Sequence, residues 1–301
     1  MEQGYRRQVS LLLSVLPEVA SEECFALHGG TAINLFVRDM PRLSVDIDLT
    51  YVPIEDRQTS LDNIRAALLR MKARIERIFN NARVTDRTDI GKLLISAQGV
   101  DIKLEVNLVC RGTIARPETL VLCARAQEEF DVFCEIPIVP LGQLYGGKIC
   151  AALDRQHPRD LFDVKYLLEN EGFSADVKTG LLLAVLSSDR PIHEVLRPTL
   201  LDQKRAFENY FVGMAVEEFA YDEFEKTRDN LVETIYTNLT NEDREFILSV
   251  KQMAPRWDIY NFEGFPSVQW KLQNLQRLSE INGAKYRGQL ADLENALGMG
   301  G

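Results

Sequence analysis

The sequence lacks several features that would assign a function directly. Its 301 residues include only three histidines and five cysteines, with no Cys-x-x-Cys pair, which excludes a structural zinc site of the usual spacing. We find no Ser-His-Asp arrangement, no Walker-type lysine after a glycine-rich loop and no dinucleotide-binding fingerprint. The odd number of scattered cysteines favours free thiols in a reducing compartment.

Long apolar runs and an excess of basic residues are also missing. No stretch approaches the ~20 apolar residues that cross a bilayer, and the N-terminus does not resemble a secretion signal. We therefore expect a cytoplasmic protein with no membrane partner. The formal net charge of −10 argues against a protein that coats nucleic acid through an overall basic surface. Residues 65–92 nevertheless carry eight Lys/Arg against three acids, as either a solvated helix face or a contact for a polyanionic substrate.

The chain is long enough for one large or two modest domains. Alternating apolar and polar residues predict strands over 44–52, 82–86, 91–98 and 101–108, and a further apolar segment covers 24–27. Apolar residues at helical spacing predict a helix from residue 5 and helices over 31–37 and 59–80. A proline-punctuated linker over 136–140 precedes predicted helices over 141–153, 159–169, 177–186, 204–218, 221–236, 242–253 and 266–282. These patterns predict an α+β protein with an N-terminal domain over 1–140 and a helical domain over 141–301.

The most informative pattern is a glycine pair followed by two aspartates. Gly29 and Gly30 precede a short predicted helix, and Asp46 and Asp48 stand at alternate positions of a predicted strand. Strand side chains alternate between faces, so the two carboxylates point the same way. Carboxylate pairs suit Mg²⁺, and a glycine turn before a helix can receive a phosphate on free backbone N–H groups. The combination indicates nucleotidyl transfer.

Four further residues complete the predicted nucleotide and metal site. Glu105 lies in the middle of the 101–108 strand and is a candidate third ligand for two Mg²⁺ ions; the alternative is a solvated strand face with Lys103 as its ion-pair partner. Thr31 either binds the triphosphate or caps the following helix. Arg42 and Ser44 precede the aspartates, where Arg42 either neutralises phosphate or serves as a counterion for the aspartates.

Taken together, these motifs make the chain similar to a known family. Gly-Gly-Thr-Ala followed by Arg-x-Ser-x-Asp-Ile-Asp-Leu resembles the AbiEii/AbiGii toxins, which include the MenT enzymes, within the DNA polymerase beta-like nucleotidyltransferases. The similarity continues at residues 144–153, 159–164, 190–196, 227–231 and 269–272, and covers most of residues 24–278. It implies a polymerase-beta-like nucleotidyltransferase domain, with a small mixed sheet flanked by helices, followed by a helical domain.

The resemblance also implies an activity and its partners. Such enzymes transfer nucleotides from an NTP to the 3′ end of tRNA with Mg²⁺, and a cognate antitoxin neutralises them in type IV toxin–antitoxin or abortive-infection phage-defence systems. The family's catalytic lysine matches Lys148, and the aspartate of its last motif matches Asp160, with Asp163 as a companion; both would reach the cleft from the helical domain. Two alternatives stay open: a protein or small-molecule hydroxyl as the acceptor, and a non-catalytic interaction protein with a degenerate transferase domain.

Overall fold

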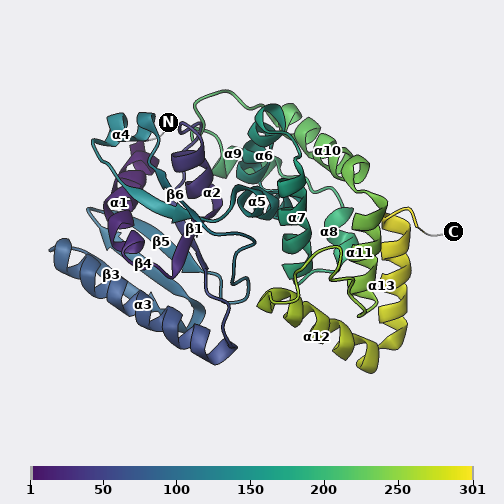
Figure 1. The fold of residues 1–301 in the computed structure, drawn as a ribbon. Helices are drawn as coiled ribbons and strands as arrows, with labels where there is room; N and C mark the ends of the chain where they lie inside the picture. The colour runs from purple at the N-terminus through teal and green to yellow at the C-terminus, as the bar shows by residue number, and fades with distance from the viewer. Residues whose placement is uncertain (1–2, 300–301) are drawn as a thin grey trace. The chain divides into compact units, whose positions relative to one another are not determined.

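The computed structural model describes residues 3–299 and is drawn in Figure 1. The chain divides into two compact units. Unit 1 holds Met1–Leu144 and Phe211–Phe219, and unit 2 holds Tyr145–Tyr210 and Ala220–Gly301. Each unit is described by itself below. The combination of one mixed sheet in unit 1 with helices in both units confirms the predicted α+β class.

Unit 1 is built on a seven-stranded mixed sheet with the order β3-β4-β5-β2-β1-β7-β6. Its central strand β2 pairs antiparallel with β1 and parallel with β5. Apolar side chains alternate with polar ones along β2 and β5, as half-buried strands require, whereas β1 is buried over Phe25–Leu27. The strands are β1 (Phe25–His28), β2 (Asp46–Tyr51), β3 (Arg83–Arg87), β4 (Lys92–Ala97), β5 (Val100–Val106), β6 (Glu118–Val121) and β7 (Glu135–Ile138).

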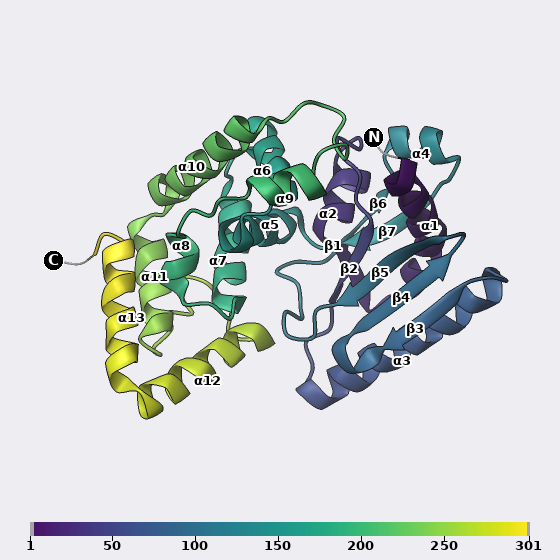
Figure 2. The same cartoon turned by 180° about the vertical axis from the view of Figure 1, so that it is seen from behind.

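Two long helices, α1 (Gln3–Ala20) and α3 (Arg57–Ile78), pack side by side against this sheet (Figures 1 and 2). Arg74 of α3 contacts Glu18 near the end of α1 at 3.0 Å and Glu22 just after α1 at 2.8 Å, and Arg70 contacts Glu22 at 2.6 Å. Part of the basic stretch over 65–92 therefore holds α1 and α3 together. Shorter helical segments complete the unit: α2 (Gly29–Ala32), a π-helical turn (Ile33–Val37), a 3-10 turn (Thr88–Ile90) and α4 (Ala124–Phe130).

Two segments differ in type from the sequence prediction, and β6 and α4 were not predicted. The predicted linker over 136–140 contains β7, which pairs with both β1 and β6 despite Pro137. A second difference lies in the predicted helix over 204–218, which ends at Tyr210 as α9 (Lys204–Tyr210). The following segment instead joins unit 1, where Leu43 N donates to Met214 O at 3.0 Å and Ala215 bridges Arg42. Long-range backbone pairing, which periodicity does not report, decides both cases.

Unit 2 is helical throughout its described part. It contains α5 (Leu141–Arg155, from Tyr145 onward), α6 (Pro158–Asn170), α7 (Ala175–Ser187), α8 (Ile192–Leu196), α9, α10 (Tyr221–Asn238), α11 (Asn241–Lys251), α12 (Pro266–Ile281) and α13 (Gly283–Ala296). The sequence prediction missed α8 and α13. Helix α10 packs on α6, and α13 packs against α8, α11 and α12 (Figure 2).

Two expectations about composition can be compared with the structure. All five cysteines are free thiols, as the odd count predicted. Within residues 3–299, no helix has the length and apolar content needed to span a membrane.

Candidate active site

The paired aspartates lie on the central strand of the unit 1 sheet. Asp46 and Asp48 are half-buried on β2, and the alternating Ile47 and Leu49 are buried. This alternation confirms that the two carboxylates share one face of the strand while the apolar side chains enter the core. The sheet therefore holds two acidic groups side by side on a rigid backbone.

The glycine pair begins where β1 ends, directly beside these aspartates. His28, the last residue of β1, is in register with Asp48 of β2, so Gly29 follows at the edge of the carboxylate site. Gly29 has φ +72°, a left-handed conformation that favours glycine. A Cβ at Gly29 would collide with Asp48 Oδ2. The absence of a side chain therefore allows the loop backbone to approach the Asp48 carboxylate.

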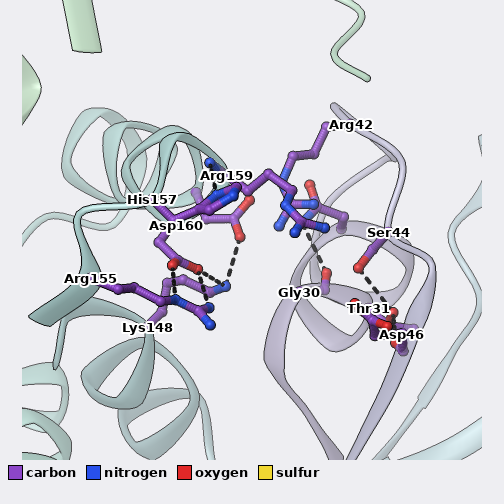
Figure 3. A network of polar contacts seen from close by, with 12 residues as sticks. Gly30, Thr31, Arg42, Ser44, Asp46, Lys148, Arg155, His157, Arg159 and Asp160 are labelled. Atoms are coloured by element: carbon purple, nitrogen blue, oxygen red, sulfur yellow. Dashed lines mark hydrogen bonds and ion pairs between the residues drawn. The ribbon is translucent and has the colours of Figure 1, made fainter. Parts of the chain in front are cut away.

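Three of the predicted nucleotide-binding side chains, those of Thr31, Arg42 and Ser44, pack around the turn at Gly29 and Gly30. A Cβ at Gly30 would lie 2.8 Å from Arg42 Nη2 and 2.9 Å from Ser44 Oγ. The Thr31 hydroxyl donates to the Asp46 carbonyl oxygen at 2.5 Å and lies 3.0 Å from Ser44 Oγ (Figure 3). Thr31, Arg42 and Ser44 are all buried. They fix the position of the loop, and their direct contact with a nucleotide stays a prediction.

Glu105 lies next to Asp48 but is engaged by lysines. The parallel register of β2 and β5 sets Glu105 beside Asp48 and Lys103 beside Asp46. Directly paired residues of neighbouring strands share a face, so Glu105 is on the predicted side of the sheet. Its carboxylate oxygens lie 3.1 Å from Lys92 Nζ and 3.0 Å from Lys103 Nζ. The structure thus contains the ion pair weighed as the alternative, and a metal-ligand role for Glu105 stays a prediction.

The electrostatics of this face reflect the mixture of acids and lysines. Burial would raise the pKa of Glu105, but hydrogen bonds from Lys103 and Lys92 lower it overall. Burial would lower the pKa of Lys103, but its hydrogen bond to Glu105 and the attraction of Asp46 and Asp48 raise it overall. Lys103 therefore already experiences the negative potential of the aspartate pair.

The carboxylates of Asp46 and Asp48 could supply two of the ligands of a divalent cation. Asp46 and Asp48 offer half-buried carboxylates from one strand face. Among residues 3–299, however, no group of three or more His, Cys, Asp or Glu side chains is arranged to hold a metal ion. Mg²⁺ commonly binds to one or two carboxylates and takes its other ligands from water and substrate phosphates. The two aspartates fit that mode of binding, and Glu105 as a third metal ligand stays a prediction.

The lysine and aspartate of the later motifs form a separate buried network in unit 2. Lys148 of α5 contacts Asp160 Oδ1 at 2.9 Å and Asp163 Oδ2 at 3.1 Å, both on α6 (Figure 3). The exposed fractions of the three side chains are 7%, 2% and 1%. Arg155, at the end of α5, also bonds Asp160, at 2.6 and 3.0 Å. One ammonium is thus held between two buried carboxylates.

A tight turn between α5 and α6 brings these groups together. Gln156 adopts φ +48°, and His157 Nδ1 accepts a hydrogen bond from Arg159 N at 3.2 Å as the N-cap of α6. Asp160 then falls in the first turn of α6, where the helix dipole favours a carboxylate. Burial would raise the pKa of Asp160, but the charge of Lys148 and the bonds from Arg155 hold it far below its usual value. Asp160 is therefore ionised and positions Lys148.

The structure thus assigns the predicted site residues to two groups. Gly29, Gly30, Asp46 and Asp48 lie together in unit 1, while Lys148 and Asp160 pair in unit 2. Sequence reasoning missed two participants. The Lys92 pairing depends on the β4–β5 register, and the Arg155 pairing depends on the α5–α6 turn. No sequence pattern predicts either of these two pairings.

Comparisons with known proteins agree with the resemblance in the motifs. The family model described as nucleotidyl transferase AbiEii toxin, type IV TA system, matches residues 10–274. No curated protein sequence matches the chain at a significant level. Among solved structures, MenT4, a nucleotidyltransferase toxin from Mycobacterium tuberculosis, is similar with a TM-score of 0.60 and 14% sequence identity, over 88% of this chain and 93% of that one. At this identity the structural likeness supports the fold.

Proposed function

Because the chain belongs to the AbiEii family of nucleotidyltransferase toxins of type IV toxin–antitoxin systems, we propose that it transfers nucleotides from an NTP to the 3′ end of tRNA. In this reaction the 3′ hydroxyl oxygen attacks the α-phosphorus, a new P–O bond forms, and the bond to pyrophosphate breaks. The modified tRNA end can no longer be aminoacylated. A cognate antitoxin would restrain this activity in the cytoplasm, and its release would serve phage defence by abortive infection.

One observation carries the proposal. The backbone of Gly29 lies against the Asp48 carboxylate so closely that a Cβ would collide with it. A loop of this kind can bring phosphate oxygens next to a carboxylate pair, which is what transfer of a nucleotide from a triphosphate requires. The buried contacts of Thr31, Arg42 and Ser44 keep the loop in this position before substrate arrives.

The proposal gives each predicted site residue a role. Asp46 and Asp48 would hold Mg²⁺ together with the triphosphate, and the ion would activate the 3′ hydroxyl and stabilise the leaving pyrophosphate. The loop at Gly29 and Gly30 would bind phosphate oxygens through backbone N–H groups. In the proposed mechanism Lys148 stabilises charge that develops on the phosphates. Asp160 acts as a positioning residue, since it already holds Lys148 at 2.9 Å.

A transfer assay tests the acceptor and the activity together. Purified protein is incubated with each of the four labelled NTPs, total tRNA and Mg²⁺, and the product is divided into RNase-treated and protease-treated halves. We expect label in tRNA that RNase removes. Label that survives RNase and is lost to protease would replace tRNA with a protein acceptor. Absence of transfer with every NTP and with Mg²⁺ or Mn²⁺ would overturn the proposal.

Matched variants connect the activity to the site. Asp48→Asn removes one carboxylate of the pair and should reduce transfer by at least about 100-fold, as expected when transition-state charge stabilisation is lost. Asp89→Asn changes an exposed carboxylate of the same unit, which pairs only with Arg87 at 3.5 Å among the contacts described, and should leave transfer unchanged. Equal activity of the two variants would favour the non-catalytic alternative.

Measured metal affinity can distinguish a site made of Asp46 and Asp48 from one that also includes Glu105. Mn²⁺ affinity, measured by electron paramagnetic resonance in the presence of NTP, should fall strongly in Asp48→Asn. If Glu105→Gln lowers the affinity equally, Glu105 is a third ligand. If Glu105→Gln leaves the affinity unchanged or raises it, Glu105 serves to hold Lys92 and Lys103, as the ion pairs at 3.1 and 3.0 Å indicate.

A further inference from the structure

A cavity of about 450 Å³ lies within unit 2, and none of the residues assigned above to nucleotidyl transfer lines it. Its walls come from the C-terminal part of α8 and the segment after it, one face of α10, the start of α11 and the end of α13. The apolar part of the lining consists of Leu196, Pro198, Leu200, Val232, Ile235, Leu239, Ala296 and Leu297. This volume and lining match those of small-molecule sites in proteins.

At one end of the cavity two arginine side chains stack on the ring of Tyr236. The guanidinium groups of Arg197 and Arg244 lie 4.7 and 4.8 Å from the ring centroid of Tyr236. Arg197 Nε donates to the Ala296 carbonyl at 3.1 Å, and Arg244 donates to the carbonyls of Leu239 at 3.1 Å and Tyr236 at 2.8 Å. Within residues 3–299, no ion pair of either arginine with a carboxylate is found. Carbonyl dipoles and the ring stabilise these charges only in part.

The α10 wall carries acidic groups on the same face as the ring. Asp229, Val232, Glu233 and Tyr236 line the cavity at positions i, i+3, i+4 and i+7 of α10, which is one face of a helix. At 1.5 Å per residue, Asp229 lies about 10 Å along the helix axis from Tyr236. Asp229 lies 3.9 Å from Arg228 Nε, and Glu233 has no ion pair within the described chain. The cavity therefore has a basic end at Tyr236 and two acidic groups, Glu233 about 4.5 Å and Asp229 about 10 Å farther along the axis of α10.

We propose that this cavity binds a short apolar peptide with free termini. Its carboxylate lies against Arg197 and Arg244, and its ammonium group lies toward Glu233 and Asp229. An extended chain spans about 3.3–3.6 Å per residue, so three residues cover the roughly 10 Å between Tyr236 and Asp229 and pass Glu233 on the way. Planar guanidinium groups favour carboxylates through paired hydrogen bonds, whereas the two acids repel polyphosphates and nucleic acid. This site is independent of the proposed nucleotidyl transfer.

Three forms of one peptide test the proposal on the full-length wild-type chain. Calorimetric titration compares Leu-Val-Leu with both ends free, with its N-terminus acetylated and with its C-terminus amidated. We expect the free peptide to bind, amidation to weaken binding by about tenfold or more, and acetylation to weaken it by a smaller factor because Asp229 is solvent-exposed. Absence of binding by the free peptide, or equal binding of all three forms, would overturn the proposal.

Variants then assign each end of the peptide to its residues. Arg197→Gln should reduce the difference between the free and amidated peptides, because only Arg244 then faces the carboxylate, and Glu233→Gln should reduce the difference between the free and acetylated peptides, because only Asp229 then faces the ammonium group. Arg205→Gln removes an exposed arginine of α9 that does not line the cavity and should leave all three affinities unchanged. Far-ultraviolet circular dichroism confirms folding of each variant. An unchanged amidation effect in a folded Arg197→Gln variant would contradict the proposed orientation.

Discussion

Replacement of Lys148 by methionine should strongly destabilise the helices that carry the buried network. Methionine keeps much of the length and apolar surface of the side chain but removes the ammonium group between Asp160 and Asp163. Breaking a buried ion pair by removing one partner costs about 3–5 kcal/mol, because a charge is left in a site that excludes water. Arg155 continues to bond Asp160, so we expect the lower part of that range.

Native-state hydrogen exchange at the amides of α5 and α6 measures this loss locally. A local measurement is appropriate because a chain with two compact units need not unfold in one step. The double variant Lys148→Met/Asp163→Asn should recover part of the loss, since it removes one of the two carboxylates that Lys148 contacts.

An exposed ion pair of the same unit supplies the control. Lys226 contacts Asp222 at 3.3 Å, with exposed fractions of 78% and 70%, so Lys226→Met should change the opening free energy by less than about 1 kcal/mol. If Lys148→Met lowers the opening free energy by no more than Lys226→Met does, the Lys148 network is not shielded from water and the argument is wrong.

Acid titration provides an independent measurement of the same network. The folded pKa of Asp160 is lowered, so its contribution to stability is complete above the unfolded pKa near 4 and is lost as the pH falls toward the folded value. The stability difference between the wild type and Asp160→Asn should therefore shrink below about pH 4. A difference that stays constant over this range would contradict the lowered pKa.

Three further predictions concern close backbone approaches and a buried amine. Gly146→Ala should destabilise unit 2 by about 1–3 kcal/mol or more, because the new Cβ would overlap the α7 backbone. Gly288→Ala places its Cβ in open space on α13 and should instead stabilise unit 2 by about 0.5–1 kcal/mol. Urea unfolding measures both changes. Gly30→Ala should displace the Arg42 guanidinium, 2.8 Å from the new Cβ, and lower NTP affinity measured by titration; unchanged affinity would refute the loop's role. Burial lowers the pKa of Lys271 to about 8, so the unfolded chain binds more protons above that pH, and wild-type stability relative to Lys271→Met should rise between pH 8 and about 10.5.

Local sequence patterns were sufficient for the central part of the unit 1 site. Alternation of apolar and acidic residues placed Asp46 and Asp48 on one strand face, and the structure confirms it. The glycine pair predicted a backbone turn before a short helix, and in the structure Gly29 has φ +72° and begins α2. These features depend on neighbouring residues alone, because strand geometry and backbone sterics operate over a few positions.

The pairings of charged groups needed the tertiary structure. Glu105 is a predicted third metal ligand, and only the β4–β5 register showed that Lys92 lies against its carboxylate. Asp163 looked like a minor companion of Asp160, yet it contacts Lys148 at nearly the same distance, 3.1 against 2.9 Å. Side chains on different strands or helices meet only after the chain has folded, and no local pattern encodes their distance.

The sequence by itself determined the α+β class and the local geometry of the aspartate pair, since periodicity and turn chemistry act over short stretches of chain, and its motifs carried the resemblance to the family. Only the tertiary structure decided that residues 135–138 pair as a strand, that the backbone at Met214 and Ala215 joins unit 1, and that Arg197 and Arg244 meet over Tyr236. Each of these depends on contacts between segments far apart in sequence, where hydrogen bonding and packing override local propensity.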